Sequence, residues 1–513
     1  MINQLIKNCI KNDNCPYYLL LLLIFFVGIF FRTYLYLQCR PFDADESHLY
    51  LSIYNSYNYF AGLSHGQVCP PFFLYIVKFV TYFGGQGEIS YRFFPYFVSI
   101  ISIFIFYLLS TKVLKNIISI LIINFIFAIN FYLNFYAQDF KQYEFDMLIV
   151  MLSILFFSNF NIKYKDNLFD YFKYGIFLFI PLLFSIPYLF SVCAFFIQEI
   201  FRIDFKNSKE IKRIVILIGT FTICSIVYYV FCLKNMQLNL LHEFPEYWKH
   251  TFLKFDFNHI YHLISKNFSY VYYPNNFNFI KLLLPLSGII CFCRKKIGVH
   301  MLLILTVAIL FSFLSLYPLG DRIILYQFPI LFLMTIMPFD FVLNNYKNDS
   351  IKLKLCAIII IIIMSLYSLG DYVFKSSSYF KNTLMMNLRV NTIPHIPILG
   401  SKFLIHDLIK YLDDTNVIFI NWGSEGPFMY YKNLYYPDKN IKYYFIDDYN
   451  KEVFDVKRST LILYMPQIFH FDIENTTEFE NNVVYKNKLG ISYLYVFKNS
   501  SMSDILKMVI FSH

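Results

Sequence analysis

Long apolar segments, separated by short polar ones, recur from residue 17 to residue 370 of the chain. Many of them approach the roughly 20 residues that a helix needs to cross the hydrocarbon core of a bilayer. The segments expected to span are 17–37, 92–110, 116–136, 145–160, 214–232, 278–293, 298–316, 323–339 and 355–370. Residues 173–203, broken at Pro181 and Pro187, add two short spans or a re-entrant pair. The pattern predicts a polytopic α-helical membrane protein with about eleven spans.

The first polar interruption is a long loop that the spans place on the external side, at residues 38–91. Within it, residues 47–60 are expected to be helical. Residues 71–83 are apolar but too short to span, and they are bounded by Pro70-Pro71 and Gly84-Gly85. We therefore expect this second segment to be a helix that lies at the membrane interface.

Lysine and arginine residues between the apolar segments give each span a direction. Lys112 and Lys115 end one segment, and Arg294-Lys295-Lys296 follow another. Because basic residues gather on the cytoplasmic side of a membrane, these loops are expected to be cytoplasmic. No cleavable signal peptide is expected, since residues 1–16 end in no small-residue cleavage site. We expect an integral, multi-pass protein with a cytoplasmic N-terminus.

The composition agrees with a membrane protein and argues against other classes. Of the 513 residues, 58% are apolar and only 15% are charged, whereas about 25% are charged in a soluble protein. The net charge of +10 would fit a nucleic-acid-binding protein, but the basic residues lie in short loops, so no nucleic acid partner is expected. The bias toward Asn, Lys, Ile, Phe and Tyr indicates an AT-rich genome and favours the bacterial inner (plasma) membrane.

The pattern changes after residue 370. We expect a transmembrane domain at 1–370, a linker at 371–399, and a small soluble α/β domain at 400–513 on the extracytoplasmic side, because the last part alternates helix-like with strand-like stretches. The clearest strand-like stretches are 416–421, 461–464 and 492–496.

Ionisable residues from distant parts of the chain fall on one predicted face. The stretch 40–48, directly after the first span, is by itself equally compatible with a solvated loop. Polar loops from distant parts of the chain, however, are predicted to lie on the same side as the loop that contains this stretch. Together they supply Asp43, Asp45, Glu46, His48, Asp139, Lys141, Asp321 and Arg322. This pattern favours a catalytic site at the outer leaflet, where a carboxylate accepts a proton and a cation holds a phosphate.

Five short motifs, in order, resemble those of the lipid-linked-sugar glycosyltransferases of the GT-C fold, a group that includes the protein O-mannosyltransferases and the bacterial aminoarabinose transferase acting on lipid A. Asp45-Glu46 resembles the Asp-Glu motif of the first external loop. Cys69-Pro70-Pro71-Phe72 resembles a His-Pro-Pro-Leu segment, and Tyr91-Arg92-Phe93-Phe94-Pro95 resembles the start of the second span. Gln138 to Tyr143 resembles the second-loop motif, and Asp321-Arg322 with Pro329 resembles the start of a late span.

This resemblance implies a reaction and a set of roles. Family members transfer a sugar, with inversion, from a polyprenyl-phosphate carrier to a hydroxyl acceptor on a lipid, a glycan or a protein. The resemblance implies Asp45 as the general base, while Glu46 either positions the acceptor or caps the next helix. Arg322, Arg92 and Lys141 are candidates for the donor phosphate, and Asp139 is the second-loop acid. Asp43, His48 and Tyr143 are candidates for acceptor binding or support. Arg322 could instead extend to the lipid headgroups, and His48 could be an ordinary interfacial histidine. Arg92 could instead pair with an acid, and Lys141 could pair with Asp139.

Two departures from the family pattern bear on these roles. Cys69 stands where the family has histidine, and Lys141 stands where it has arginine, which keeps the charge but loses the bidentate fork. No cofactor is certain, although oxygen ligands from Asp45, Glu46 and Asp139 would suit a divalent cation. Cys39 and Cys69 would be able to form a disulfide if the first loop faces an oxidising compartment.

Two other classes remain alternatives at this stage. A transporter or flippase would place ionisable residues in the middle of spans and often contain internal repeats, whereas the predicted spans are almost free of charge and contain no visible repeat. An O-antigen-type polymerase also has many spans and large external loops, but Asp-Glu directly after the first span and a C-terminal external domain are not expected of it.

Overall fold

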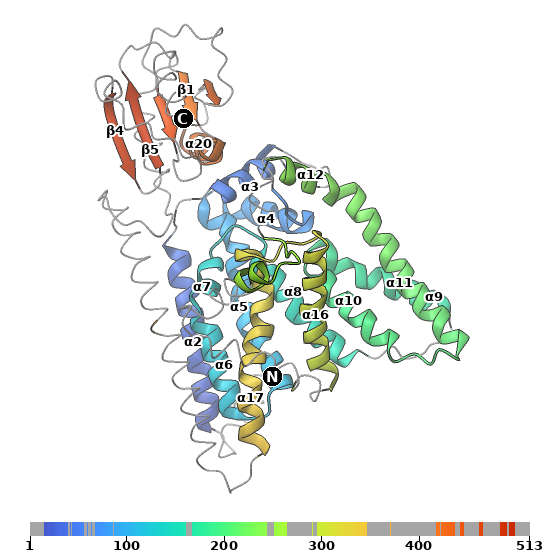
Figure 1. Ribbon diagram of the computed structural model, residues 1–513. Coiled ribbons are helices and arrows are strands. Elements are labelled where there is room, and N and C mark those ends of the chain that lie inside the picture. The colour runs from blue at the N-terminus through green and yellow to red at the C-terminus, as the bar shows by residue number, and fades with distance from the viewer. Residues whose placement is uncertain are drawn as a thin grey trace.

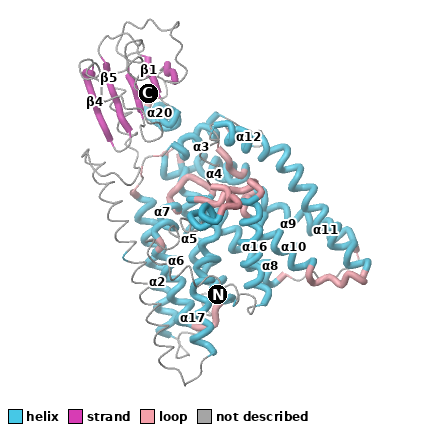
Figure 2. The backbone as a smooth tube through the Cα atoms, viewed as in Figure 1, coloured by secondary structure: helices cyan, strands magenta, loops and turns pink. Residues whose placement is uncertain are grey.

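The computed structural model describes residues 15–38, 40, 42, 44–55, 59, 63, 67–85, 87–160, 167–243, 251–263, 290, 295–345, 370, 417–420, 422–436, 442–445, 461–464, 483–489 and 492–497. Most of these residues form helices, and a small sheet with one helix lies near the C-terminus (Figure 1, Figure 2).

The helical part is built from elements of very different lengths. They are α2 (Cys15–Leu37), α3 (Ala44–Asn55), α4 (Pro71–Gly84), α5 (Glu88–Val113), α6 (Ile117–Ile129), α7 (Phe131–Tyr136), α8 (Tyr143–Asn159), α9 (Leu168–Phe179), η2 (Ile180–Leu183), α10 (Tyr188–Ile200), α11 (Ser208–Tyr228), η3 (Tyr229–Leu233), α12 (Lys234–Glu243), α16 (Lys295–Phe313), η4 (Asp321–Gln327) and α17 (Phe328–Asn345).

Five helical stretches in the described part of the chain are long and apolar enough to cross a membrane. They are Pro16–Leu37, Glu88–Val113, Ser208–Leu238, Lys296–Phe313 and Arg322–Asn344. The chain is therefore an integral, multi-pass membrane protein. The predicted total of about eleven spans stays a prediction, because two of the predicted segments, 278–293 and 355–370, lie almost entirely outside the described residues.

Two predicted segments are interrupted in the structure. The break expected in residues 173–203 is confirmed, since α9 gives way to η2 and then, after Pro187, to α10. The segment 116–136, predicted as one span, is instead two helices, because Asn130 adopts an extended conformation (φ −60°, ψ 124°) and caps α7 through Leu133 N–H. The carbonyl of Ala128, left at the end of α6, accepts a hydrogen bond of 3.1 Å from Arg32.

The helix predicted at 71–83 is present as α4, whereas its location at the membrane interface stays a prediction. It begins at Pro71, which suits the first turn because proline has no N–H to satisfy there. It ends where Gly85 takes φ +84°, a left-handed conformation that favours glycine. Figure 1 shows α3, α4 and α12 gathered at one end of the long helices.

The C-terminal sheet has five strands in the order β2-β1-β3-β5-β4. Their bounds are β1 (Val417–Ile420), β2 (Lys442–Phe445), β3 (Leu461–Tyr464), β4 (Val483–Leu489) and β5 (Ser492–Phe497). β1 pairs in parallel with β2 and β3, whereas β5 runs antiparallel to β3 and β4. Helix α20 (Trp422–Tyr435) lies between this sheet and α3 (Figure 1). Three strands coincide with predicted stretches, while the domain boundaries and the side of the membrane stay predictions.

A close crossing of α9 and α11 depends on a glycine and gives a stability prediction. A Cβ atom at Gly175 would lie 2.7 Å from Thr220 Cβ and 3.1 Å from the Leu217 carbonyl oxygen. Gly175→Ala is expected to destabilise the protein by about 1–3 kcal/mol, because the two helices must move apart. Gly219→Ala, in open space on α11, is the control. Thermal unfolding in detergent measures both, and equal melting temperatures would contradict the prediction.

Candidate active site

Asp45 and Glu46 occupy the first turn of α3, directly after the first long helix. Acidic residues suit this position, since the N-terminal end of a helix carries a partial positive charge. Their surroundings nevertheless differ sharply. The Glu46 side chain is fully buried, whereas 31% of the Asp45 side chain is exposed. Two adjacent carboxylates therefore sit in two different environments.

Glu46 is the centre of a buried set of charged hydrogen bonds. Arg92, from the start of α5, donates to both carboxylate oxygens, through Nε at 2.7 Å and Nη2 at 2.5 Å. The backbone N–H of Phe140 donates to Oε1 at 2.8 Å, and Arg40 Nη1 lies 3.3 Å from Oε2. Each oxygen of Glu46 thus has two partners, and together these partners come from three separate segments of the chain.

The set continues from Glu46 to the second loop. Arg40 donates to Asp139, and Arg92 also donates to the carbonyl oxygen of Arg40. The guanidinium of Arg92 lies over the Phe42 ring, 4.9 Å from its centroid. All four charged side chains are at most 7% exposed. We call Arg40, Glu46, Arg92 and Asp139 the buried ion cluster; it joins the loop after α2, the start of α5 and the loop before α8.

The cluster fixes the ionisation of Glu46. Burial alone would raise the pKa of this carboxyl group, but the nearby charges of Arg40 and Arg92 outweigh that effect and lower the pKa to about 2. Glu46 is therefore a carboxylate throughout the physiological range. A buried carboxylate held this firmly suits the positioning of its neighbours better than proton exchange with a substrate.

Asp45 makes a different ion pair, with Arg322 of η4, which lies 277 positions later in the sequence. The Arg322 side chain is 27% exposed, and its guanidinium lies over the Tyr143 ring, 5.8 Å from its centroid. Thus Asp45, Arg322 and Tyr143, three predicted site residues from three distant segments, are brought together by the fold. This pair is open to solvent beside the closed ion cluster.

Lys141, two residues after Asp139, has different side-chain partners. Its ammonium group donates to Gln67 Oε1 at 2.5 Å. It also lies close enough to Cys69 to act on that thiol: burial raises the Cys69 pKa, and the positive charge of Lys141 opposes the rise. Lys141 therefore lies near Cys69, the residue that stands in place of a histidine in the motif that this segment resembles. Cys69 is a free thiol, so the structure does not contain the Cys39–Cys69 disulfide that the sequence left open.

The remaining predicted residues are placed as follows. Arg92 pairs with an acid, which was the second of its two predicted alternatives. The carboxylate of Asp139 pairs with Arg40. His48, in α3, is fully buried. Asp43 lies outside the described residues. Arg40 and Gln67 were not predicted; the position of Arg40 just before the acidic stretch was the only signal for it.

A metal site of three acidic, histidine or cysteine ligands is not found among the residues that the structure describes. Glu46 and Asp139, two of the three predicted ligands of a divalent cation, already bind arginines. Two carboxylates held in this way do not fit a site built from Asp45, Glu46 and Asp139 together.

This arrangement sits in a fold that occurs in known proteins. The chain has a GT-C-like fold, shown by its similarity to a solved structure. That structure is ArnT from Cupriavidus metallidurans bound to undecaprenyl phosphate, with a TM-score of 0.50 and 8% sequence identity over 94% of this chain and 98% of that chain. At this identity the similarity establishes the fold alone.

Two further solved structures are similar to the chain at lower TM-scores. ArnT from the same bacterium in the apo state has a TM-score of 0.49 at 8% identity, over 94% of this chain and 97% of that chain. The Archaeoglobus fulgidus oligosaccharyltransferase in complex with zinc and sulfate has a TM-score of 0.43 at 14% identity, over 80% of this chain and 61% of that chain. No protein-family model matches the chain, and no curated protein matches it in sequence.

Proposed function

We propose that the chain is an integral-membrane, inverting glycosyltransferase that moves a sugar from a polyprenyl-phosphate carrier to a hydroxyl group. The carrying observation is the Asp45–Arg322 pair, partly open to solvent beside a closed ion cluster. A carboxylate and a guanidinium together supply a proton acceptor and a phosphate ligand. The GT-C-like fold, shared with a protein solved with undecaprenyl phosphate bound, supports a lipid phosphate as the donor's leaving group.

In the proposed reaction, Asp45 takes the proton of the acceptor hydroxyl as the acceptor oxygen attacks C1 of the sugar. The bond between C1 and the phosphate oxygen breaks on the opposite face, so the configuration at C1 inverts. The polyprenyl phosphate leaves with the bonding electron pair and gains negative charge. Arg322 stabilises that charge, and it must then exchange part of its contact with Asp45 for the phosphate.

Lys141 is proposed as the second phosphate cation. It is only 6% exposed and hydrogen-bonded to Gln67, so its ammonium group is held in place before a donor arrives. Its location beside Cys69 supports the idea that it replaces the charge of the family's histidine. Arg92 and Asp139 are proposed to act through the buried ion cluster rather than on the donor.

The proposed surroundings follow from the sequence. We infer that the site faces the extracytoplasmic side of the inner membrane, where a polyprenyl-linked donor and a lipid, glycan or protein acceptor are both available. Because Glu46 and Asp139 pair with arginines, no step through a divalent cation is proposed, and addition of EDTA to the assay below tests whether sugar transfer needs one.

The direct test uses membranes that contain the protein and a panel of radiolabelled polyprenyl-phosphate sugars. We expect one donor to lose its sugar, by transfer or by slow hydrolysis, in a reaction that undecaprenyl phosphate inhibits. Membranes from cells without the protein are the control. Movement of an intact donor across the membrane without loss of sugar would support a flippase, and growth of a glycan on its own carrier would support a polymerase.

Arg322→Gln is expected to raise the KM for the active donor by about 10- to 100-fold, because charged hydrogen bonds to the phosphate are lost. Arg202→Gln is the matched control, since Arg202 is 43% exposed and pairs only locally with Glu199. Steady-state kinetics in detergent measure both variants. An unchanged KM for Arg322→Gln would remove this residue from the phosphate site.

A further inference from the structure

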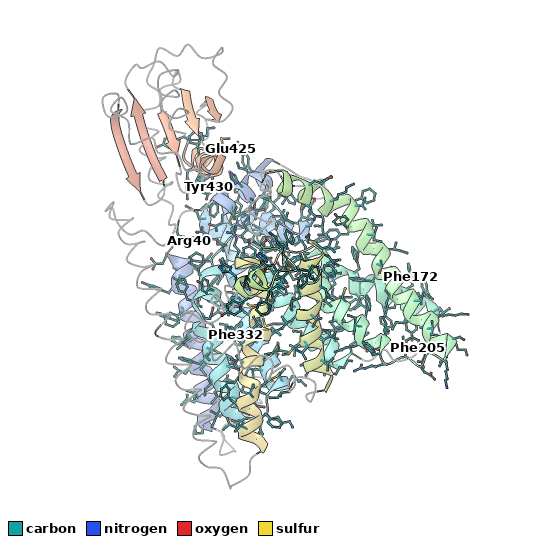
Figure 3. All side chains as sticks on the ribbon, viewed as in Figure 1. Arg40, Phe172, Phe205, Phe332, Glu425 and Tyr430 are labelled. Atoms are coloured by element: carbon teal, nitrogen blue, oxygen red, sulfur yellow. The ribbon has the colours of Figure 1, made fainter. Side chains whose placement is uncertain are left out.

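Helix α20, from the C-terminal part of the chain, packs into the same hydrophobic core as Phe42 and helix α3. Phe428, Tyr430 and Tyr431 are fully buried, although they lie between two strands of the small sheet in the sequence. The Tyr430 ring lies 4.5 Å from that of Phe42 and 4.6 Å from that of Tyr50, measured between centroids. Figure 3 shows Tyr430 and Glu425 between the sheet and α3.

The hydroxyl of Tyr431 ties the loop before Asp45 to the start of α5. It accepts a hydrogen bond of 2.9 Å from the backbone N–H of Phe42, 389 positions earlier in the sequence, and donates one of 3.3 Å to Glu88 Oε1. Glu88 is only 4% exposed. Because burial raises the pKa of Tyr431, the hydroxyl keeps its proton and can both accept and donate a hydrogen bond.

A glycine of α20 touches the backbone just after Asp45. A Cβ atom at Gly426 would lie 2.6 Å from His48 Cδ2, 2.7 Å from Ser47 Oγ and 3.0 Å from the His48 backbone nitrogen. Any larger residue would push α20 away from α3. The contact explains why His48 is buried, and it gives α20 a second anchor on the first turn of α3.

We infer that α20 positions Asp45: through Tyr431 and Gly426 it holds the backbone on both sides of that residue and keeps its carboxylate directed at Arg322. Phe42 is fixed three residues before Asp45, and Ser47 and His48 are fixed two and three residues after it. Tyr431 and Gly426 are positioning residues, because they act through this backbone. This inference rests on the proposed function, which makes Asp45 the base.

The inference gives the C-terminal part of the chain a role inside the catalytic site. A shift of α20 would move the first turn of α3, which carries Asp45, but would leave Arg322, on η4, and Lys141, in the second loop, in place. Loss of the α20 contacts should therefore slow the chemical step while the binding of the donor phosphate stays the same. If α20 contributed only to overall stability, its loss would affect kcat and the donor KM together.

The test compares full-length Tyr431→Phe with Tyr229→Phe, which loses a hydrogen bond of 2.9 Å to Gln237 at an exposed site. For Tyr431→Phe we expect kcat with the active polyprenyl-phosphate sugar to fall by about 10- to 100-fold, because both buried hydrogen bonds of the hydroxyl are lost. The donor KM should stay within about twofold of wild type. Hydrogen exchange, followed by mass spectrometry, should accelerate in the peptide that contains residues 42–48. Tyr229→Phe should change neither kcat nor the hydrogen exchange of residues 42–48.

The outcomes separate the inference from the proposed function. Equal kcat for the two tyrosine variants, or a fall in kcat matched by a rise in KM, would overturn the positioning role while leaving the glycosyltransferase intact. Wild-type protein inactive toward every donor would overturn the proposed function, and the positioning of a base with it. If Tyr431→Phe does not fold, Gly426→Ala is compared with Gly219→Ala, and the same fall in kcat at constant KM is required.

Discussion

Asp45→Asn is expected to lower kcat for sugar transfer by about 10²- to 10⁴-fold, the usual contribution of a general base. Asparagine keeps the size of the side chain and can still accept a hydrogen bond from Arg322, but it cannot take up a proton. The donor KM should change little, because Arg322 and Lys141 remain to bind the phosphate. The measurement is turnover of the active polyprenyl-phosphate sugar, together with binding of undecaprenyl phosphate.

Asp204→Asn is the matched control for this experiment. Asp204 lies in an exposed turn and accepts a hydrogen bond of 3.0 Å from the Lys206 N–H, so the same chemical change there should leave kcat unchanged. Full activity of Asp45→Asn would keep the enzyme but move the base to Asp43 or Asp139. Loss of both turnover and undecaprenyl phosphate binding would mean that the variant disturbs the site rather than the proton transfer.

The helical part of the fold could be predicted because apolar length alone determines what crosses a bilayer. Breaks at Pro181 and Pro187 were visible for the same reason, since proline interrupts a helix wherever it falls. The break between α6 and α7 was missed because Asn130 is compatible with a helix interior. It ends α6 here because its side chain caps α7 and because Arg32, from another helix, satisfies the freed Ala128 carbonyl.

The residues of the candidate site could be predicted from the sequence, but the different environments of Asp45 and Glu46 could not. The sequence placed Asp45 and Arg322 on one face, and the structure brings them into an ion pair. It could not distinguish Asp45 from Glu46, since neighbouring residues in a helix point about 100° apart and only the packing decides which one is buried. The carboxylate of Glu46 forms ion pairs with Arg40 and Arg92.

Contacts over long distances in sequence were beyond the reach of any local pattern. No helix was predicted at 422–435, where Gly426 and Pro427 disfavour one, and nothing in these residues says that Tyr431 meets Phe42. Lys141 is an intermediate case. It was predicted to bind the donor phosphate. Only the fold shows that it lies near Cys69, where it provides a positive charge that the cysteine side chain does not have.

Glu46→Gln is expected to destabilise the protein by about 3–5 kcal/mol, because it leaves the buried cations Arg40 and Arg92 without their shared negative charge. Glutamine has nearly the same shape, so the loss reports the charge rather than a cavity. The measurement is chemical unfolding in detergent micelles. Glu210→Gln is the control, since Glu210 makes only solvent-exposed hydrogen bonds, to Asp204 N–H and Asn207.

The pH dependence of this difference identifies its cause. The pKa of Glu46 is about 2 in the folded protein, below its ordinary value of 4.5, so the ionised carboxylate stabilises the folded state fully above pH 4.5 and loses that effect as the pH falls toward 2. The stability gap between wild type and Glu46→Gln should therefore be constant from pH 7 to pH 5 and shrink in more acidic solution. A gap that stays constant into acid would mean that glutamine is poorly packed there, and that the arginines do not depend on the charge of Glu46. A gap that closes would show that the ionised carboxylate of Glu46 stabilises the folded state through its pairs with Arg40 and Arg92.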